Sequence, residues 1–295
     1  MAIHRETLEK YAIKIIDKKK FSLSNSTKRP NALMDEVKIL SKLKHPNIIS
    51  IKEVFETETN LYIVLELVTG GELFDKLLNG AFSEDLSRNY FKQMLEATKY
   101  LHDQGIAHRD LKPENILFKD ETEEIIKLSD FGLSRVVDKA SFMQTICGTP
   151  QYVAPEILTS AKTEGYGLAC DLWSLGVILY IMLSGSQPFD DEKSTTIFEQ
   201  IVNTDYSFDA KKWKSISPNA IRLIKQLLNP NPSTRLTVSE ALESPWMKGI
   251  AGDPLSSDSK SSDSVAESES EEPSSKKRPS SMEPEQQTPS KKCKK

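Results

Sequence analysis

Glycine is missing from the start of this 295-residue chain, where Gly70 is the first one. A glycine-rich loop that wraps phosphate groups is therefore not expected near the N-terminus.

Cysteine is scarce, and Cys147, Cys170 and Cys293 fit neither a disulfide framework nor a metal-ligand spacing. We expect free thiols in a reducing compartment. The longest apolar run, 175–183, is shorter than a membrane span of about 20 residues and predicts a buried helix.

A large excess of one charge is also lacking. The 39 Lys and Arg and 43 Asp and Glu residues leave a net charge of -4, which argues against general nucleic-acid binding. The polar, charged N-terminus is unlike a secretory signal. We expect a soluble intracellular protein without a direct nucleic-acid or membrane partner.

The composition changes near residue 249. The segment 249–295 has no aromatic residue and is rich in Ser, Glu, Lys and Pro, so we expect a disordered tail. Its basic clusters KKRP (276–279) and KKCKK (291–295) resemble a bipartite nuclear localisation signal. They predict a nuclear protein that also occurs in the cytoplasm.

Upstream of the tail, the patterns predict an α+β fold with a small β-rich lobe (1–69) and a larger helical lobe (70–248). Strands are predicted in YAIKII, ISIKEVF, NLYIVLEL and IIKLSDF, the middle two forming a hairpin. ALMDEVKILSKL predicts a helix in which Glu36 shares a face with Leu33 and Leu40, so this carboxylate needs a partner.

Capping residues mark further helices in the second lobe. Ser83 and Gly105 bound one amphipathic stretch, and Ser217 followed by Pro218 begins another. The stretch CDLWSLGVILYIML is apolar nearly all round and predicts a buried helix.

The chemistry is concentrated in HRDLKPEN (108–115) and DFG (130–132). Phosphoryl transfer needs a carboxylate near the acceptor hydroxyl, oxygen ligands for a metal, and cations for the developing charge. Asp110 can supply the first, Asn115 and Asp130 are oxygen ligands of the kind that Mg²⁺ prefers, and Lys14 and Lys112 supply positive charge.

Together with YAIK (11–14), GTPQYVAPE (148–156), DLWSLG (171–176) and Arg235, these motifs resemble those of eukaryotic serine/threonine protein kinases, in the same order. The resemblance is to the calcium/calmodulin-dependent group and, within it, to checkpoint-kinase-2-like members. It implies a two-lobed kinase fold, ATP and Mg²⁺ as cofactors, and protein substrates in DNA-damage or cell-cycle signalling.

The resemblance also assigns roles to individual residues. It implies that Lys14 pairs with Glu36 and holds the ATP phosphates, that Asp110 is the catalytic base, that Lys112 contacts the γ-phosphate, and that Asn115 and Asp130 hold Mg²⁺. The implied adenine site comprises the gatekeeper Leu65, the hinge Glu66, Leu67 and Val68, and Leu117 on the floor. Glu72 and Glu114 are expected to read an arginine three residues before the acceptor, and Glu72 also to contact the ribose. Structural roles are implied for a Glu156–Arg235 ion pair and for Asp171, which should brace the catalytic loop.

Regulation is implied by Arg109, which directly precedes Asp110. An arginine there is typical of kinases that an upstream kinase activates by phosphorylating the activation loop, here at Thr145 or Thr149. Lys112 favours serine or threonine over tyrosine as the acceptor. The resemblance leaves a homodimer open.

Two parts of the resembled kinases are missing: the glycine-rich loop and the forkhead-associated domain. We therefore expect a truncated product of a longer kinase, with low turnover and greatly weakened ATP binding. The alternative is a non-catalytic protein that competes for the partners of the full-length kinase. The intact Lys14, Asp110 and Asp130 favour the enzyme.

Overall fold

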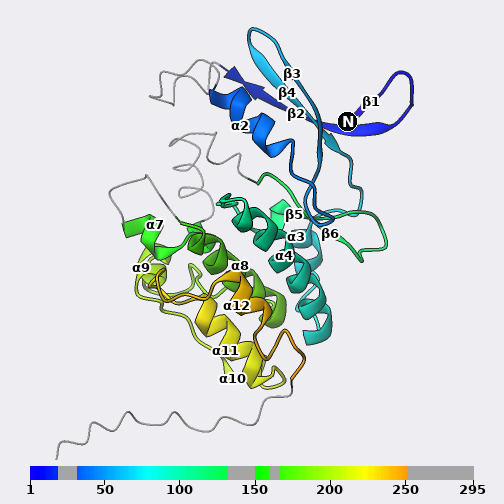
Figure 1. Cartoon of the computed structure of the whole chain (residues 1–295). Coiled ribbons are helices and arrows are strands. Elements are labelled where there is room, and N and C mark those ends of the chain that lie inside the picture. Colours follow the sequence, from blue (N-terminus) through cyan, green and yellow to red (C-terminus); the bar gives the residue numbers. More distant parts are fainter. Residues whose placement is uncertain (19–31, 132–149, 160–166, 251–295) are drawn as a thin grey trace, which may run out of the picture. The chain divides into compact units, whose positions relative to one another are not determined.

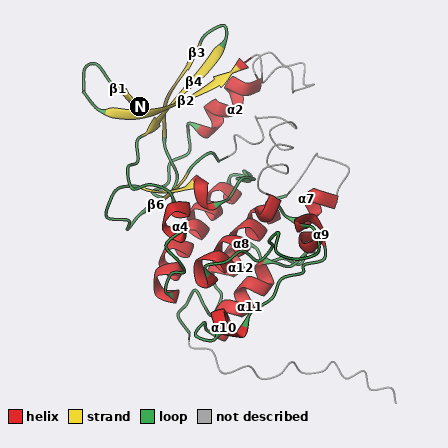
Figure 2. Ribbon diagram, turned by 180° about the vertical axis from the view of Figure 1, so that it is seen from behind, coloured by secondary structure: helices red, strands yellow, loops and turns green. Residues whose placement is uncertain are grey.

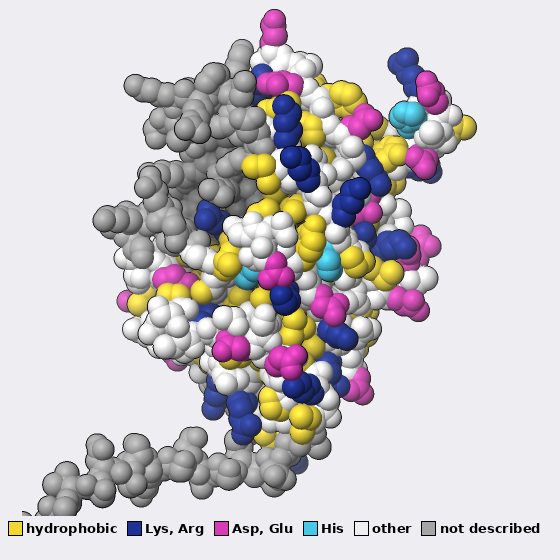
Figure 3. All heavy atoms as spheres, in the orientation of Figure 1, with side chains coloured by type: hydrophobic (Ala, Val, Ile, Leu, Met, Phe, Trp, Pro, Cys, Tyr) yellow, Lys and Arg dark blue, Asp and Glu magenta, His cyan; other side chains and the backbone are white. Residues whose placement is uncertain are grey.

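The structure is a computed structural model, which describes residues 1–18, 32–131, 150–159 and 167–250, without the side chains of 32, 33, 35 and 36. Nearly all of the tail predicted over 249–295 lies outside these residues. Within them, no helix combines the length and apolar character needed to cross a membrane. Acidic and basic side chains are interspersed over the face shown in Figure 3.

An antiparallel sheet forms the N-terminal part (Figures 1 and 2). Its spatial order is β1-β2-β4-β3, and its strands are β1 (Ala2–Ile3), β2 (Lys10–Asp17), β3 (Ile51–Glu56) and β4 (Asn60–Glu66). β3 and β4 pair as the predicted hairpin. β1 pairs with β2 only through Ala2–Tyr11 and Ile3–Lys10.

One helix, α2 (Ala32–Leu40), covers one face of this sheet (Figure 1). The alternation along β4 turns Leu61 and Ile63 inward, where they are buried in one apolar cluster with Val37 and Leu40 of α2. Each such side chain contributes roughly 1.5–3 kcal/mol on burial. The helix and sheet predicted for the first lobe are confirmed.

Helices make up the C-terminal part. They are α3 (Leu73–Leu77), α4 (Glu84–Asp103), α7 (Pro155–Thr159), α8 (Ala169–Ser184), α9 (Ile197–Val202), α10 (Ala210–Trp213), α11 (Pro218–Leu227) and α12 (Val238–Leu242), with 3₁₀ turns at Pro113–Asn115 and Pro150–Tyr152. The predicted caps are present, because Ser83 accepts a bond from the Leu86 N–H and Ser217 from the Ala220 N–H. The apolar helix α8 is buried from Cys170 to Leu183 and packs against α4 and α11, as predicted.

A two-stranded sheet, β5 (Ile116–Phe118) and β6 (Ile126–Leu128), lies at the junction of the two parts. The backbone of Leu128 in β6 makes two hydrogen bonds to the segment that follows α2. Its N–H donates to the Asn47 carbonyl at 2.8 Å, and its carbonyl accepts from the Ile49 N–H at 2.9 Å. These bonds fasten the segment after α2 to the strand that leads into Asp130.

Candidate functional site

The loop between α4 and β5 carries the polar cluster that the sequence predicts. The Asn115 Nδ2 donates to the backbone oxygen of Asp110 at 2.7 Å and to its carboxylate at 2.8 Å. The Lys112 ammonium lies 3.3 Å from the other carboxylate oxygen of Asp110. Among the described residues, the Asn115 side chain bonds only through its Nδ2, so its side-chain oxygen remains available to them as a ligand.

Asp171 of α8 braces this loop, which confirms that prediction. Its carboxylate accepts bonds from the backbone N–H groups of His108 and Arg109, both at 2.8 Å. His102 Nε2 lies 2.8 Å from the same carboxylate. Burial alone would raise the pKa of Asp171, but the bond and charge of His102 and the loop N–H groups lower that pKa overall. The brace is therefore an ionised carboxylate.

The sequence interpretation missed His102. It follows the buried Leu101 on α4, and its side chain is 7% exposed. A histidine at the border of an apolar helix face is the signal that could have identified it as a partner for a buried acid.

Two residues of the site adopt left-handed backbone conformations. Arg109 has φ 68° and Asp130 has φ 58°. Such conformations are uncommon outside glycine and cluster at functional sites. At Arg109, the bond from its N–H to Asp171 helps to hold this conformation.

Lys14 of β2 points at Asp130. Its ammonium lies 2.6 Å from the Asp130 carboxylate, and the two side chains are 35% and 38% exposed. The structure thus brings together the predicted phosphate-binding lysine and a predicted metal ligand. Glu36 lies in α2, but its side chain is outside the described residues, so the Lys14–Glu36 pair stays a prediction.

The predicted adenine-binding residues line the junction of the two parts. Leu65 and Glu66 end β4, and no described residue bonds the backbone of the following Leu67 or Val68. These backbone groups are therefore available to a planar polar ligand. Leu65 also borders a small pocket, whose lining comprises Lys14, Leu40, Ile49, Ile51, Ile63, Leu65, Asp130 and Phe131.

Glu72 and Leu117 lie beside each other, because the backbones of the two residues form an isolated bridge. Glu72 directly precedes α3 and donates its N–H to the Asp75 carboxylate at 3.4 Å. Leu117 pairs with Lys127 across β5 and β6. The structure thus brings the predicted ribose contact next to the predicted floor of the adenine site.

Glu114 has a buried carboxylate oxygen, Oε2, that has no hydrogen-bond partner among the described residues. Burial raises the pKa of the nearby Tyr152, and the negative charge of Glu114 raises it further. An unpaired buried carboxylate oxygen is costly, and a cation from outside the chain would satisfy it.

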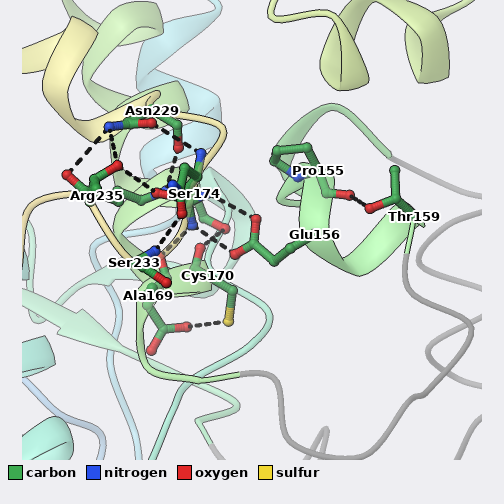
Figure 4. A network of polar contacts seen from close by, with 12 residues as sticks. Pro155, Glu156, Thr159, Ala169, Cys170, Ser174, Asn229, Ser233 and Arg235 are labelled. Atoms are coloured by element: carbon green, nitrogen blue, oxygen red, sulfur yellow. Dashed lines mark hydrogen bonds and ion pairs between the residues drawn. The ribbon is translucent and has the colours of Figure 1, made fainter.

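The predicted Glu156–Arg235 pair is confirmed (Figure 4). Two nitrogens of the Arg235 guanidinium each donate to one Glu156 oxygen at 2.8 Å, and further bonds reach the carbonyls of Asn229 and Ala169. The guanidinium also lies 5.3 Å from the Trp173 ring centroid. The pair joins α7 to the loop before α12 and has a structural role.

The predicted regulatory residues Thr145 and Thr149 lie outside the described residues. A metal could be held by Asn115 and Asp130, whose oxygens suit a hard cation. Among the described residues, no group of three or more His, Cys, Asp or Glu side chains could hold a metal. An ion at Asn115 and Asp130 would therefore need additional ligands, such as phosphate oxygens or water.

Comparisons with known proteins agree with this arrangement. Residues 1–247 match the protein kinase domain family. The chain is 55% identical over 247 residues to the probable serine/threonine-protein kinase fhkC of Dictyostelium discoideum, covering 83% of this chain and 41% of that protein. It is 44% identical over 256 residues to mouse calcium/calmodulin-dependent protein kinase type IV, covering 86% and 52%. The chain thus spans about half or less of these relatives.

The fold also resembles a solved structure. The crystal structure of Rad53 1–466 in complex with AMP-PNP aligns with a TM-score of 0.70 at 36% identity, covering 83% of this chain and 60% of that one.

Proposed function

The chain belongs to the protein kinase domain family, and we propose that it transfers the γ-phosphoryl group of ATP to serine or threonine hydroxyls of proteins. The observation that carries this proposal is the cluster around Asp110, with Asn115 at 2.8 Å and Lys112 at 3.3 Å on a loop braced by Asp171. Such a cluster suits a reaction in which a positioned carboxylate accepts a hydroxyl proton near cations.

Each residue then has one task. The acceptor oxygen bonds the γ-phosphorus while the bond from that phosphorus to the β–γ bridging oxygen breaks. Asp110 takes the hydroxyl proton, and the electron pair of the broken bond leaves on ADP. Lys112 lies beside Asp110 and offsets the charge that develops on the transferred group.

The same geometry supports a bound nucleotide and a metal ion. The backbone of Leu67 and Val68 would bond the adenine, and Lys14 the phosphates. Asn115 and Asp130 would hold Mg²⁺, which neutralises phosphate charge when bound. The amide oxygen of Asn115, which no described residue bonds, and the carboxylate of Asp130 support this set.

We propose a preference for arginine three residues before the acceptor, read by Glu114 together with Glu72. The unpaired buried oxygen of Glu114 supports it, because a guanidinium would supply the missing donor. The resemblance of the chain's motifs to those of checkpoint-kinase-2-like members supports a role of that kind in DNA-damage or cell-cycle signalling. The basic clusters at 276–279 and 291–295 favour the nucleus. Arg109, directly before Asp110, supports activation by an upstream kinase at Thr145 or Thr149, because a phosphate there would pair with an arginine.

The test is phosphate transfer from Mg²⁺-ATP to a peptide with arginine three residues before a serine. The wild-type chain should label the peptide, and Asp130→Asn should not, while both melt at similar temperatures. A peptide with alanine in place of the arginine should be labelled more slowly. Equal labelling by wild type and Asp130→Asn would refute the proposed role of this site.

A second candidate is a binding protein that competes for the partners of an active kinase. The 2.6 Å ion pair between Lys14 and Asp130 favours it, since the predicted phosphate-binding lysine and the predicted metal ligand are bonded to each other. Mg²⁺-ATP at a hundred times its Kd would stabilise a nucleotide-binding fold by about 2.7 kcal/mol. No rise in melting temperature at millimolar Mg²⁺-ATP would favour the binding protein.

A further inference from the structure

Lys127 is the one lysine among the buried residues of the described part of the chain, at 8% exposed. It stands in the middle of β6, between Ile126 and Leu128, both of which are fully buried. Its ammonium donates to the Glu66 carboxylate at 2.8 Å. An ammonium in this position needs such a partner, because an unpaired buried charge is strongly unfavourable.

Glu66 joins a third segment to this pair. The same carboxylate oxygen accepts a bond from the Ser50 N–H at 2.8 Å, and the Glu66 N–H donates to the Ser50 carbonyl at 3.0 Å. Glu66 is thus held through both its backbone and its side chain. Its carboxylate connects the end of β4, the start of β3 and the middle of β6.

The pair stands between the two ends of the proposed nucleotide site. On one side, Glu66 is followed directly by Leu67 and Val68, whose backbone groups are available to adenine. On the other side, Lys127 precedes Asp130 by three residues, and Asp130 lies at the phosphate end beside Lys14. The bond between Lys127 and Glu66 therefore links the two segments that carry these ends.

We propose that Lys127 and Glu66 are positioning residues, which hold the hinge and the strand leading to Asp130 at the spacing that one bound nucleotide requires. This inference rests on the proposed function, because it needs Mg²⁺-ATP in the site. Neither side chain touches the reacting atoms. They act by letting the adenine contacts and the phosphate contacts form at the same time. A nucleotide held at both ends is correctly oriented, and this orientation contributes to binding and to rate.

A purely structural role would predict something different. If the pair only stabilised the fold, its loss would lower the melting temperature and leave the ligand affinities of the folded protein unchanged. If it sets the spacing, a ligand that uses one end of the site should bind normally, and a ligand that uses both ends should bind weakly. Adenosine and Mg²⁺-ATP are two such ligands.

The experiment measures the Kd of adenosine and of Mg²⁺-ATP for the full chain and its variants by titration calorimetry. Lys127→Met should raise the Kd of Mg²⁺-ATP about tenfold, and change that of adenosine less than twofold. Lys127→Arg keeps the charge and should restore Mg²⁺-ATP binding to within about threefold. Lys99→Met, which breaks the exposed pair with Asp103, is the matched control and should change neither Kd.

Steady-state rates give a second readout. The KM for ATP should rise in Lys127→Met, while the KM for the peptide stays within twofold. Unchanged ATP affinity, or an equal loss for adenosine and Mg²⁺-ATP, would overturn the inference.

Glu66→Gln decides the matter if Lys127→Met does not fold. Glutamine keeps an acceptor oxygen for both donors and removes only the charge. A Kd for Mg²⁺-ATP about three times the wild-type value is therefore expected, and an unchanged Kd overturns the inference.

The proposed function and this inference fail in different ways. A wild-type chain that binds no Mg²⁺-ATP overturns the proposed function together with this inference. Normal wild-type binding with normal binding by the variants overturns the inference alone.

Discussion

Replacement of Asp171 by asparagine tests whether one buried carboxylate holds the catalytic loop. Asp171 is 1% exposed, and its two oxygens accept bonds from the N–H groups of His108 and Arg109. Asparagine has the same shape but only one acceptor oxygen. Whichever way its amide turns, an NH₂ group faces a backbone N–H, so one buried donor loses its partner.

The magnitude follows from these contacts. A lost bond to a charged group costs about 1.5–3 kcal/mol, and an unsatisfied buried donor costs about 1–3 kcal/mol. These two costs partly describe the same lost bond and are not simply added. We expect Asp171→Asn to lower the free energy of unfolding by about 3 kcal/mol. For a domain of this size, that loss corresponds to roughly 6–12 °C in melting temperature.

Activity should fall as well, because Asp110 follows Arg109 directly. We expect kcat to drop at least about tenfold, which corresponds to about 1.4 kcal/mol of the activation barrier. The assay pairs denaturant unfolding with peptide phosphorylation at saturating ATP.

The matched control is Asp85→Asn, since Asp85 also bonds an arginine, Arg88 at 2.6 Å, but is 93% exposed. Exposed pairs of this kind contribute little, so this control should behave as wild type. If Asp171→Asn were as stable and as active as Asp85→Asn, the bracing role would be refuted.

Three further outcomes are expected. Arg235→Met should destabilise the fold by about 3–5 kcal/mol in denaturant unfolding, and Arg235→Lys should recover only part, because an ammonium cannot bond both Glu156 oxygens as the guanidinium does. Burial lowers the pKa of His108 in the folded chain, so the imidazole binds a proton more readily in the unfolded chain. The melting temperature should therefore fall as the pH drops below about 6.5, and it should fall less in His108→Gln. Glu114→Gln should raise the KM of the arginine-bearing peptide about tenfold and leave that of an alanine-substituted peptide unchanged.

Local signals predicted the elements that local interactions build. Ser83 and Ser217 cap α4 and α11 as expected, because a cap needs only residues within one turn. The hairpin of β3 and β4 follows from two strand-like runs around a short turn. α8 follows from an apolar stretch too uniform for a surface helix.

The strand predictions were less accurate at their ends. IIKLSDF predicted a strand over 125–131, but β6 ends at Leu128. Beyond it, Ser129 bonds the Asn115 carbonyl and Asp130 turns to φ 58°, which is incompatible with a strand. Function overrides β propensity here, because the turn presents the Asp130 carboxylate to Lys14.

Long-range pairing could be predicted only where a resemblance supplied it. Lys14 and Asp130 are 116 residues apart, and nothing in the local sequence selects Asp130 over other carboxylates as its partner. The pairing depends on which strands the fold brings together. The resemblance gave Glu156 as the partner of Arg235, whereas His102 and Lys127 were missed.

A charged residue inside an apolar element is nevertheless a usable signal. Glu36 drew attention for this reason, and the same rule applies to Lys127 in β6 and Asp171 in α8. In the structure, Lys127 is paired with Glu66 and Asp171 with the catalytic loop. Apolar packing is non-directional and can hold elements together without fixing one spacing between them. Directional hydrogen bonds from buried charged groups fix such spacings. The charged residues whose burial is energetically costly, Lys127 and Asp171, are therefore the ones that hold the segments of the candidate site together.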